Sequence, residues 1–290
     1  MARKHQAAVA GAAAAGLLLS AWLAPALGQD QPAPAAPPQV RQERPAPPGP
    51  IMPAPFSRDC QVASDAVISQ SPLPNVAAAL QNRKTIKILA IGASAGAGWR
   101  GRRGGYTEQI EDILEKAVTG LKVETINRGV SGELAADAAK RIKTEVALNE
   151  PDLVLWQVGT NDALAYVPID ELRDTIVETI RWLKEHKVDV VLVGLQFVHP
   201  KAQDDNYRTV RELIRSIGAQ ENVVVVRRGE AMRLLTQAAG SGGGLFPEEF
   251  AKTETGYACL AEYVARAITL GVFGRGLRPL PPRAGQPGQQ

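Results

Sequence analysis

The chain has 290 residues, 45% of them hydrophobic and 22% charged, which is the composition of a folded, water-soluble protein with one large domain or two small ones. Its net charge of +3 excludes a chain-wide basic surface of the kind that grips nucleic acid. Two cysteines and three histidines, one of them at position 5, exclude a cysteine-built metal site and a three-histidine site in a mature chain. We expect no metal and no other cofactor.

The first 28 residues have the pattern of a secretory signal peptide. Arg3 and Lys4 form a short basic region, residues 7–24 are almost continuously apolar, and small residues precede a cleavage site before Gln29. The alternative is an uncleaved membrane anchor, because the apolar stretch is nearly long enough to span a bilayer. We expect cleavage and export to the periplasm or the extracellular space, with membrane contact only if the segment is retained.

Residues 29–55 form a Pro/Ala-rich segment with almost no aliphatic side chains to bury, which predicts an extended linker. Residues 275–290 have a similar composition and are expected to be a disordered tail. The folded part is therefore predicted to be residues 56–274, about the size of one α/β domain.

Five short apolar runs rich in β-branched residues predict strands at 85–91, 121–126, 152–158, 188–195 and 222–226. Helical patterns lie near 106–118, 133–148, 170–186, 207–217, 230–239 and 257–270. This alternation predicts an α/β fold, a three-layer α/β/α sandwich with a five-stranded parallel sheet. The carboxyl ends of parallel strands share one edge, where the chemistry of open α/β sheets is found.

Small and polar residues follow the first three predicted strands. Ser94 lies in the first of these loops, Gly132 in the second and Asn161 in the third. A serine nucleophile needs a base to take its proton and donors for the oxyanion that forms. The N–H groups of Ser94 and Gly132 and the amide of Asn161 are suited to that second task.

These loops, in this order, resemble the SGNH (GDSL-type) hydrolase superfamily, in particular its exported bacterial branch. Ser94, in Gly-Ala-Ser at 92–94, matches the nucleophile, and Asn161, in the run VLWQVGTN, matches the oxyanion asparagine. Gly132 matches the oxyanion glycine, and Gly129 is the alternative match if the motif is aligned three residues earlier. The resemblance implies a flavodoxin-like SGNH fold and ester hydrolysis through a seryl–acyl intermediate, on acylated carbohydrates, lipids or simple esters.

The pattern departs from the family just before the last helix. Family members carry Asp-x-x-His there, whereas this chain has Glu248 and Ala251, and alanine cannot accept a proton. Either the base has moved to His199, oriented by Asp204 or Asp205, or the domain binds a glycan or acyl ligand without fast turnover. The sequence predicts an esterase, with the binding module as the alternative.

Other residues of the first loop have two interpretations each. Arg100 is expected either to hold an anionic part of the substrate or to lie on a solvated surface, and Trp99 either to stack on a sugar or to anchor the loop. Residues 96–101 also spell G-x-G-x-x-G, the pattern of a dinucleotide-binding oxidoreductase. We regard that as a distant alternative, because the first glycine lies four residues beyond Gly92 and arginines stand where a helix should begin.

The two cysteines are expected to pair. Disulfides form in the oxidising compartments that exported proteins enter. A bond between Cys60, at the start of the domain, and Cys259, in its last helix, would close a loop of nearly 200 residues. The alternative is two buried free thiols.

Overall fold

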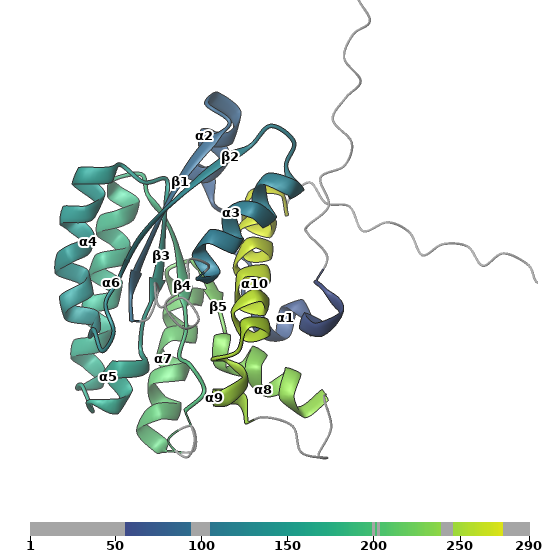
Figure 1. Cartoon of the computed structure of the whole chain (residues 1–290). Coiled ribbons are helices and arrows are strands. Elements are labelled where there is room, and N and C mark those ends of the chain that lie inside the picture. Colours follow the sequence, from purple (N-terminus) through teal and green to yellow (C-terminus); the bar gives the residue numbers. More distant parts are fainter. Residues whose placement is uncertain (1–55, 94–104, 199–200, 202–203, 239–245, 275–290) are drawn as a thin grey trace, which may run out of the picture. The chain divides into compact units, whose positions relative to one another are not determined.

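The computed structural model describes residues 56–93, 105–198, 201, 204–238 and 246–274. The predicted signal segment, linker and tail lie outside this part. Five parallel strands form one sheet in the order β2-β1-β3-β4-β5, which confirms the predicted fold (Figure 1). The strands are β1 (Thr85–Gly92), β2 (Lys122–Gly129), β3 (Leu153–Gln157), β4 (Asp189–Val193) and β5 (Val224–Val226).

Side chains of the central strands alternate between two hydrophobic clusters, one on each face of the sheet. In β3, Leu155 belongs to one cluster, whereas Val154 and Trp156 belong to the other. All five residues of β3 are buried. Because both faces are covered, the strand is apolar on successive residues, as expected for a strand between two helix layers.

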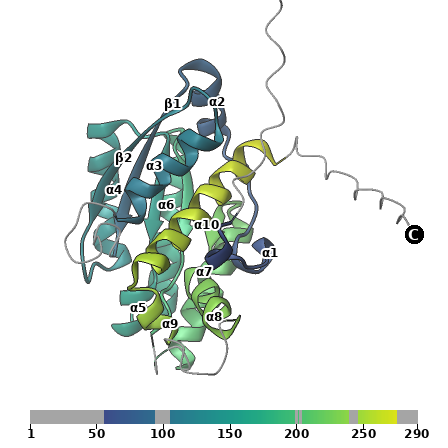
Figure 2. The same cartoon turned by 45° about the vertical axis from the view of Figure 1, so that its right-hand side comes forward.

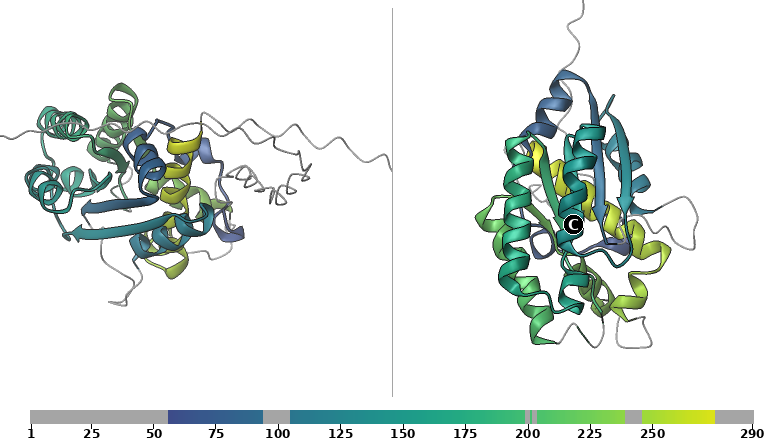
Figure 3. Two further views of the ribbon diagram at one scale, coloured as in Figure 1. Left: turned by 90° about the horizontal axis from the view of Figure 1, so that it is seen from above. Right: turned by 90° about the vertical axis from the view of Figure 1, so that its left-hand side faces the viewer.

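The helices form two layers. One face of the sheet is covered by α4 (Ala135–Asn149), α6 (Ile169–Glu185) and α7 (Asp205–Gln220), which lie side by side (Figure 3). The other face is covered mainly by α2 (Pro74–Asn82), α3 (Tyr106–Ala117), α8 (Arg228–Ala238) and α10 (Glu254–Phe273), of which α10 runs alongside α3 (Figure 2). None of the helices in the described ranges is both long and apolar enough to cross a membrane.

Short elements were not predicted from the sequence. They are the 3-10 turn η1 (Arg58–Cys60) and the helices α1 (Ser64–Val67), α2, α5 (Thr160–Leu164) and α9 (Pro247–Phe250). The predicted helix at 133–148 begins two residues later, at Ala135. Elements of three to five residues contain no repeated apolar stripe, so periodicity does not detect them. In α2, which has nine residues, only Val76 and Ala79 are buried.

A disulfide joins Cys60 to Cys259, as predicted, across a sequence separation of 199 residues. Both cysteines are buried, and the hydroxyl of Tyr263, one turn further along α10, donates to the carbonyl of Cys60 at 2.8 Å. The bond therefore ties the start of the domain to its last helix.

Candidate active site

The first three strands end side by side. Gly92, the last residue of β1, is in register with Gly129 of β2 and with Gln157 of β3. Two hydrogen bonds continue this pairing into the loops, from Val130 N to Gly92 O at 3.1 Å and from Ala93 N to Gln157 O at 3.3 Å. The loops that carry the predicted site residues therefore start at one edge of the sheet.

Gly92 lets the backbone before Ser94 lie directly against β3. Its φ is +99°, and a Cβ atom there would lie 2.1 Å from the carbonyl oxygen of Gln157. Only glycine fits this position. Ser94 itself, together with Trp99, Arg100 and His199, lies outside the described residues, as does the G-x-G-x-x-G stretch at 96–101.

The structure brings Gly132 and Asn161 together. Asn161 lies in α5, and its Nδ2 donates to the carbonyl oxygen of Glu133 at 2.9 Å, next to Gly132 in the chain. Gly132 has a φ of +81°, and no described atom other than those of its chain neighbours lies within 4 Å of the position that its Cβ would occupy. The backbone of this loop is thus open on one side, where a substrate group has room to approach.

Gly132 and Gly129, the two candidates for the oxyanion glycine, differ in the hydrogen bonds of their backbone N–H groups. The N–H of Gly129 donates to Asn127 Oδ1 at 3.1 Å. Within the described ranges, no hydrogen bond occupies the N–H of Gly132. The backbone N–H of Gly132 is therefore available to a ligand, whereas that of Gly129 is not.

Asp162 connects the second and third loops. Its carboxylate accepts from the backbone N–H of Ala135 at 2.8 Å and of Gly159 at 3.1 Å, and its side chain is buried. Burial raises the pKa of Asp162, and these hydrogen bonds oppose that rise. These bonds hold the loop after β3 against the start of α4.

The positions that depart from the family pattern lie near α9. Ala251 is 1% exposed and packs in the core beside Gly256, whereas Glu248 forms an ion pair with Lys252 at 3.0 Å. Asp204, one of the two carboxylates predicted to orient His199, caps α7 and accepts from the hydroxyl of Tyr166 at 3.0 Å. That hydrogen bond lowers the pKa of Asp204.

Of the three histidines, the described part contains His186 alone. It follows the last residue of α6 and stacks on Trp182, with ring centroids 3.9 Å apart. Because α6 leads into β4, His186 lies at the amino end of that strand, away from the edge that carries Gly132 and Asn161. No described group of three or more histidine, cysteine, aspartate or glutamate residues could hold a metal ion.

Sequence reasoning missed a group of polar side chains near the carboxyl ends of β4 and β5. Arg228 begins α8, separated from β5 only by Arg227, and is 3% exposed. Tyr207 of α7 donates its hydroxyl to Gln196 O at 2.5 Å, and Tyr106 begins α3. The signal was present in the sequence, since Arg227 and Arg228 directly follow the apolar run of the fifth strand.

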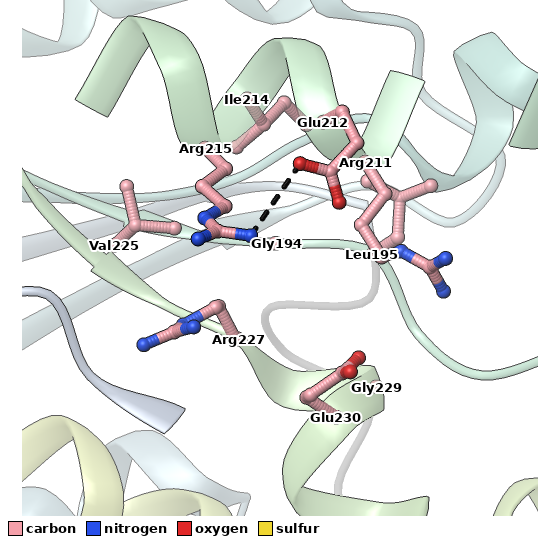
Figure 4. Close-up of a pocket in the computed structure, with 10 residues that line it drawn as sticks. All are labelled: Gly194, Leu195, Arg211, Glu212, Ile214, Arg215, Val225, Arg227, Gly229 and Glu230. Carbon is pink, nitrogen blue, oxygen red and sulfur yellow. Dashed lines mark ion pairs between the residues drawn. The ribbon is translucent and has the colours of Figure 1, made fainter. Parts of the chain in front are cut away.

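A pocket lies at the same ends of β4 and β5 (Figure 4). It is lined by Gly194, Leu195, Arg211, Glu212, Ile214, Arg215, Val225, Arg227, Gly229 and Glu230. Arg215 and Glu212, which lie one turn apart on α7, form an ion pair at 3.5 Å on one side of it. The charges that line this pocket are mixed, with three arginines and two glutamates.

Comparisons with known proteins identify the family and agree with the fold. A model described as the non-GDSL lipase-like family matches residues 59–273. An acetylxylan esterase of Geobacillus stearothermophilus is 23% identical over 135 residues, which cover 42% of this chain and 62% of that protein. The match thus spans less than two thirds of the esterase.

Two solved structures share the fold. A protein assigned to the lipolytic G-D-S-L family from Desulfitobacterium hafniense DCB-2 has a TM-score of 0.50 and 20% identity, over 63% of this chain and 99% of that one. An acetyl xylan esterase has a TM-score of 0.52 and 22% identity, over 63% of this chain and 100% of that one. In place of Gly-Asp-Ser-Leu, this chain has Gly-Ala-Ser-Ala at 92–95.

Proposed function

The chain belongs to the non-GDSL lipase-like family, among the SGNH/GDSL-type hydrolases, and on that premise we propose that it is a serine esterase. The substrate would be an acyl ester of a small molecule or an oligosaccharide, since two similar proteins are acetylxylan esterases. The observation that carries the proposal is the hydrogen bond between Asn161 Nδ2 and Glu133 O, beside the open backbone of Gly132.

In the proposed reaction, the Ser94 hydroxyl attacks the ester carbonyl carbon and its proton passes to a base. The oxyanion of the tetrahedral intermediate accepts hydrogen bonds from Gly132 N–H and from the Asn161 amide. Collapse expels the alcohol, which takes up the proton, and leaves an acyl group on Ser94. Water then attacks the acyl carbon and releases the acid. His199 is the candidate base, because it follows β4 in the chain after the carboxyl end of that strand.

Hydrolysis of p-nitrophenyl acetate tests this proposal with three variants. Ser94→Ala should fall to the background rate, and His199→Ala should lose most of the activity if His199 is the base. Ser131→Ala is the matched control, because it removes a hydroxyl from the second loop at the same edge. It should retain the wild-type rate. Equal background rates in the wild-type protein and Ser94→Ala would refute the esterase.

The second candidate is a domain that binds an acylated glycan without turnover. It is favoured by Ala251, a buried alanine where the family pattern has its histidine. Calorimetric binding of acetylated xylo-oligosaccharide, together with a background hydrolysis rate, would support this candidate over the esterase.

We also propose that the protein is exported after cleavage before Gln29. The support is the basic, apolar and small-residue pattern of residues 3–28 together with the disulfide, a bond that oxidising compartments favour. Mass spectrometry of the protein purified from its own cells should give an N-terminus at Gln29. An intact Met1 would contradict the proposal.

A further inference from the structure

A buried arginine at the carboxyl edge of the sheet has no counter-ion within the described ranges. Arg228 is 3% exposed, and it takes part in none of the ion pairs between described residues. Its Nε is buried and has no hydrogen-bond acceptor. Arginine is almost never fully buried unless it is paired, because removing an unpaired charge from water is costly.

Three phenols interact with this charge. Arg228 interacts electrostatically with Tyr106 of α3, Tyr257 of α10 and Tyr207 of α7, which belong to three different helices. The hydroxyl of Tyr106 is buried and has no hydrogen-bond partner, whereas that of Tyr207 is used on Gln196 O. Two buried donors, Arg228 Nε–H and Tyr106 O–H, are therefore left without acceptors in one cluster.

The tyrosines do not supply the missing negative charge at neutral pH. Burial raises the pKa of Tyr106 and of Tyr207 to about 12, although the charge of Arg228 opposes the rise at both. Burial also lowers the pKa of Arg228, which reflects the cost of holding a guanidinium there. The cluster thus has an excess of positive charge and of donors.

The neighbouring arginine behaves differently. Arg227 donates to the carbonyl of Asp65 and lines the pocket of Figure 4, which also holds Glu212 and Glu230. Arg228 is the next residue, but its side chain is buried. The backbone N–H of the following residue, Gly229, donates to Leu195 O at 2.9 Å. Arg227 is only partly buried and has the charges of Glu230, Asp65 and Glu212 nearby, although its Nε also lacks an acceptor in the described part of the chain. Arg228 is almost completely buried and has no such carboxylates among the described residues.

We propose that Arg228 and Tyr106 form a binding site for an oxyanion, a carboxylate or a phosphate, at the carboxyl edge of the sheet. A guanidinium matches such oxygens in charge and geometry, and the Tyr106 hydroxyl is a further donor. This inference goes beyond the proposed esterase, because anion binding requires no hydrolysis. The two sources of an oxyanion are a carboxylate and a phosphate ligand.

Thermal unfolding of the purified protein with sodium acetate, and separately with sodium phosphate, tests the site against sodium chloride at equal ionic strength. A ligand that binds only the folded state raises Tm, so we expect a saturable rise of about 4 °C with one or both oxyanions. The acetate and phosphate arms identify the anion that the site prefers.

The variants assign the rise to this cluster. Arg228→Met keeps a side chain of similar length without charge and should abolish the rise. Arg228→Lys keeps the charge without the planar fork and should need at least about tenfold more anion. Arg233→Met is the matched control, since Arg233 is a partly exposed arginine on the same helix, and it should respond as the wild type does.

Two results would overturn the proposal. One is a wild-type Tm that rises no more with acetate or phosphate than with chloride. The other is an equal rise in Arg228→Met, which would assign anion binding to the exposed arginines instead. If Arg228→Met does not fold, the anion-dependent rise in Tm is compared between the wild type and Arg228→Lys, which retains the charge and most of the volume of the side chain. An unchanged anion requirement in Arg228→Lys would then contradict the proposal.

Discussion

The side-chain amide of Asn161 has two N–H groups, and among the described residues one hydrogen bond uses it, to Glu133 O. The second N–H is free to face a ligand. Because the bond to Glu133 fixes the amide next to Gly132, we propose that the remaining N–H and the backbone N–H of Gly132 donate to the same oxygen. This is the arrangement that an oxyanion requires.

Replacing Asn161 tests that role. Asn161→Ala should lower kcat for p-nitrophenyl acetate by about 100- to 1,000-fold, because one oxyanion donor is lost, while KM changes little. Asn149→Ala serves as the control, since the Asn149 amide bonds Glu145 at the far end of α4. Steady-state kinetics measures both, and an equal loss of kcat in the two variants would contradict a specific role.

The carboxylate of Asp162 makes the stability of the protein depend on pH. Its folded-state pKa is raised above 3.8 by burial, so the folded state binds the proton more tightly than the unfolded state does. Its contribution to stability is therefore fully present below pH 3.8 and declines as the pH rises through the folded-state pKa.

The variant Asp162→Asn separates the pH dependence due to Asp162 from that due to other carboxylates. One of these is Asp189, whose pKa is also raised by burial. The free energy of unfolding of the wild type minus that of Asp162→Asn should fall as the pH rises from 3 through the acidic range. Urea unfolding of both proteins at a series of pH values measures this difference in the free energy of unfolding. A difference that grows with pH would mean that the carboxylate is better stabilised in its charged form.

At the scale of elements, the end of β1 is the most constrained point of the site. Gly92→Ala should destabilise the protein by about 3 kcal/mol or more, because the methyl group would meet Gln157 O at a positive φ. Gly120→Ala is a matched control, since Gly120 also has a positive φ of +77°, but a Cβ there would meet no described atom within 4 Å beyond its chain neighbours. It should cost only about 1–2 kcal/mol. Equal losses in urea unfolding would rule out the close approach.

The long elements were predictable from the sequence because each buries a regular pattern. The stripe of Leu172, Ile176, Ile180 and Leu183 predicted α6, and all four residues are buried. By contrast, α2 depends on Asp189, whose carboxylate accepts from the N–H groups of Asn75 and Val76 at 2.9 Å, more than 110 positions away. No local pattern contains such a contact.

The same distinction applies to the candidate site. Parallel strand order was enough to predict that the loops carrying Gly132 and Asn161 lie together. It was not enough to predict the cluster of Arg228 and three tyrosines, because those residues come from four helices whose packing the sequence pattern does not specify. The roles of Ser94 and His199 stay predictions.

At the scale of the whole molecule, the disulfide is the main covalent constraint. Closing a loop of 199 residues lowers the entropy of the unfolded chain and is worth about 5 kcal/mol at most. Cys60→Ala/Cys259→Ala should therefore lose stability in urea unfolding by up to that amount. The unreduced, unfolded wild type should contain no free thiol, and a count of two thiols would contradict the bond.

The central claim is that Ser94 is a nucleophile held beside the donors of Gly132 and Asn161. A reactive p-nitrophenyl phosphonate tests it most directly, because its adduct mimics the tetrahedral intermediate. Peptide mapping by mass spectrometry should find one adduct, on Ser94, which forms at least about 100-fold more slowly in Asn161→Ala. An unmodified Ser94, or labelling of Ser131 to the same extent, would contradict the claim.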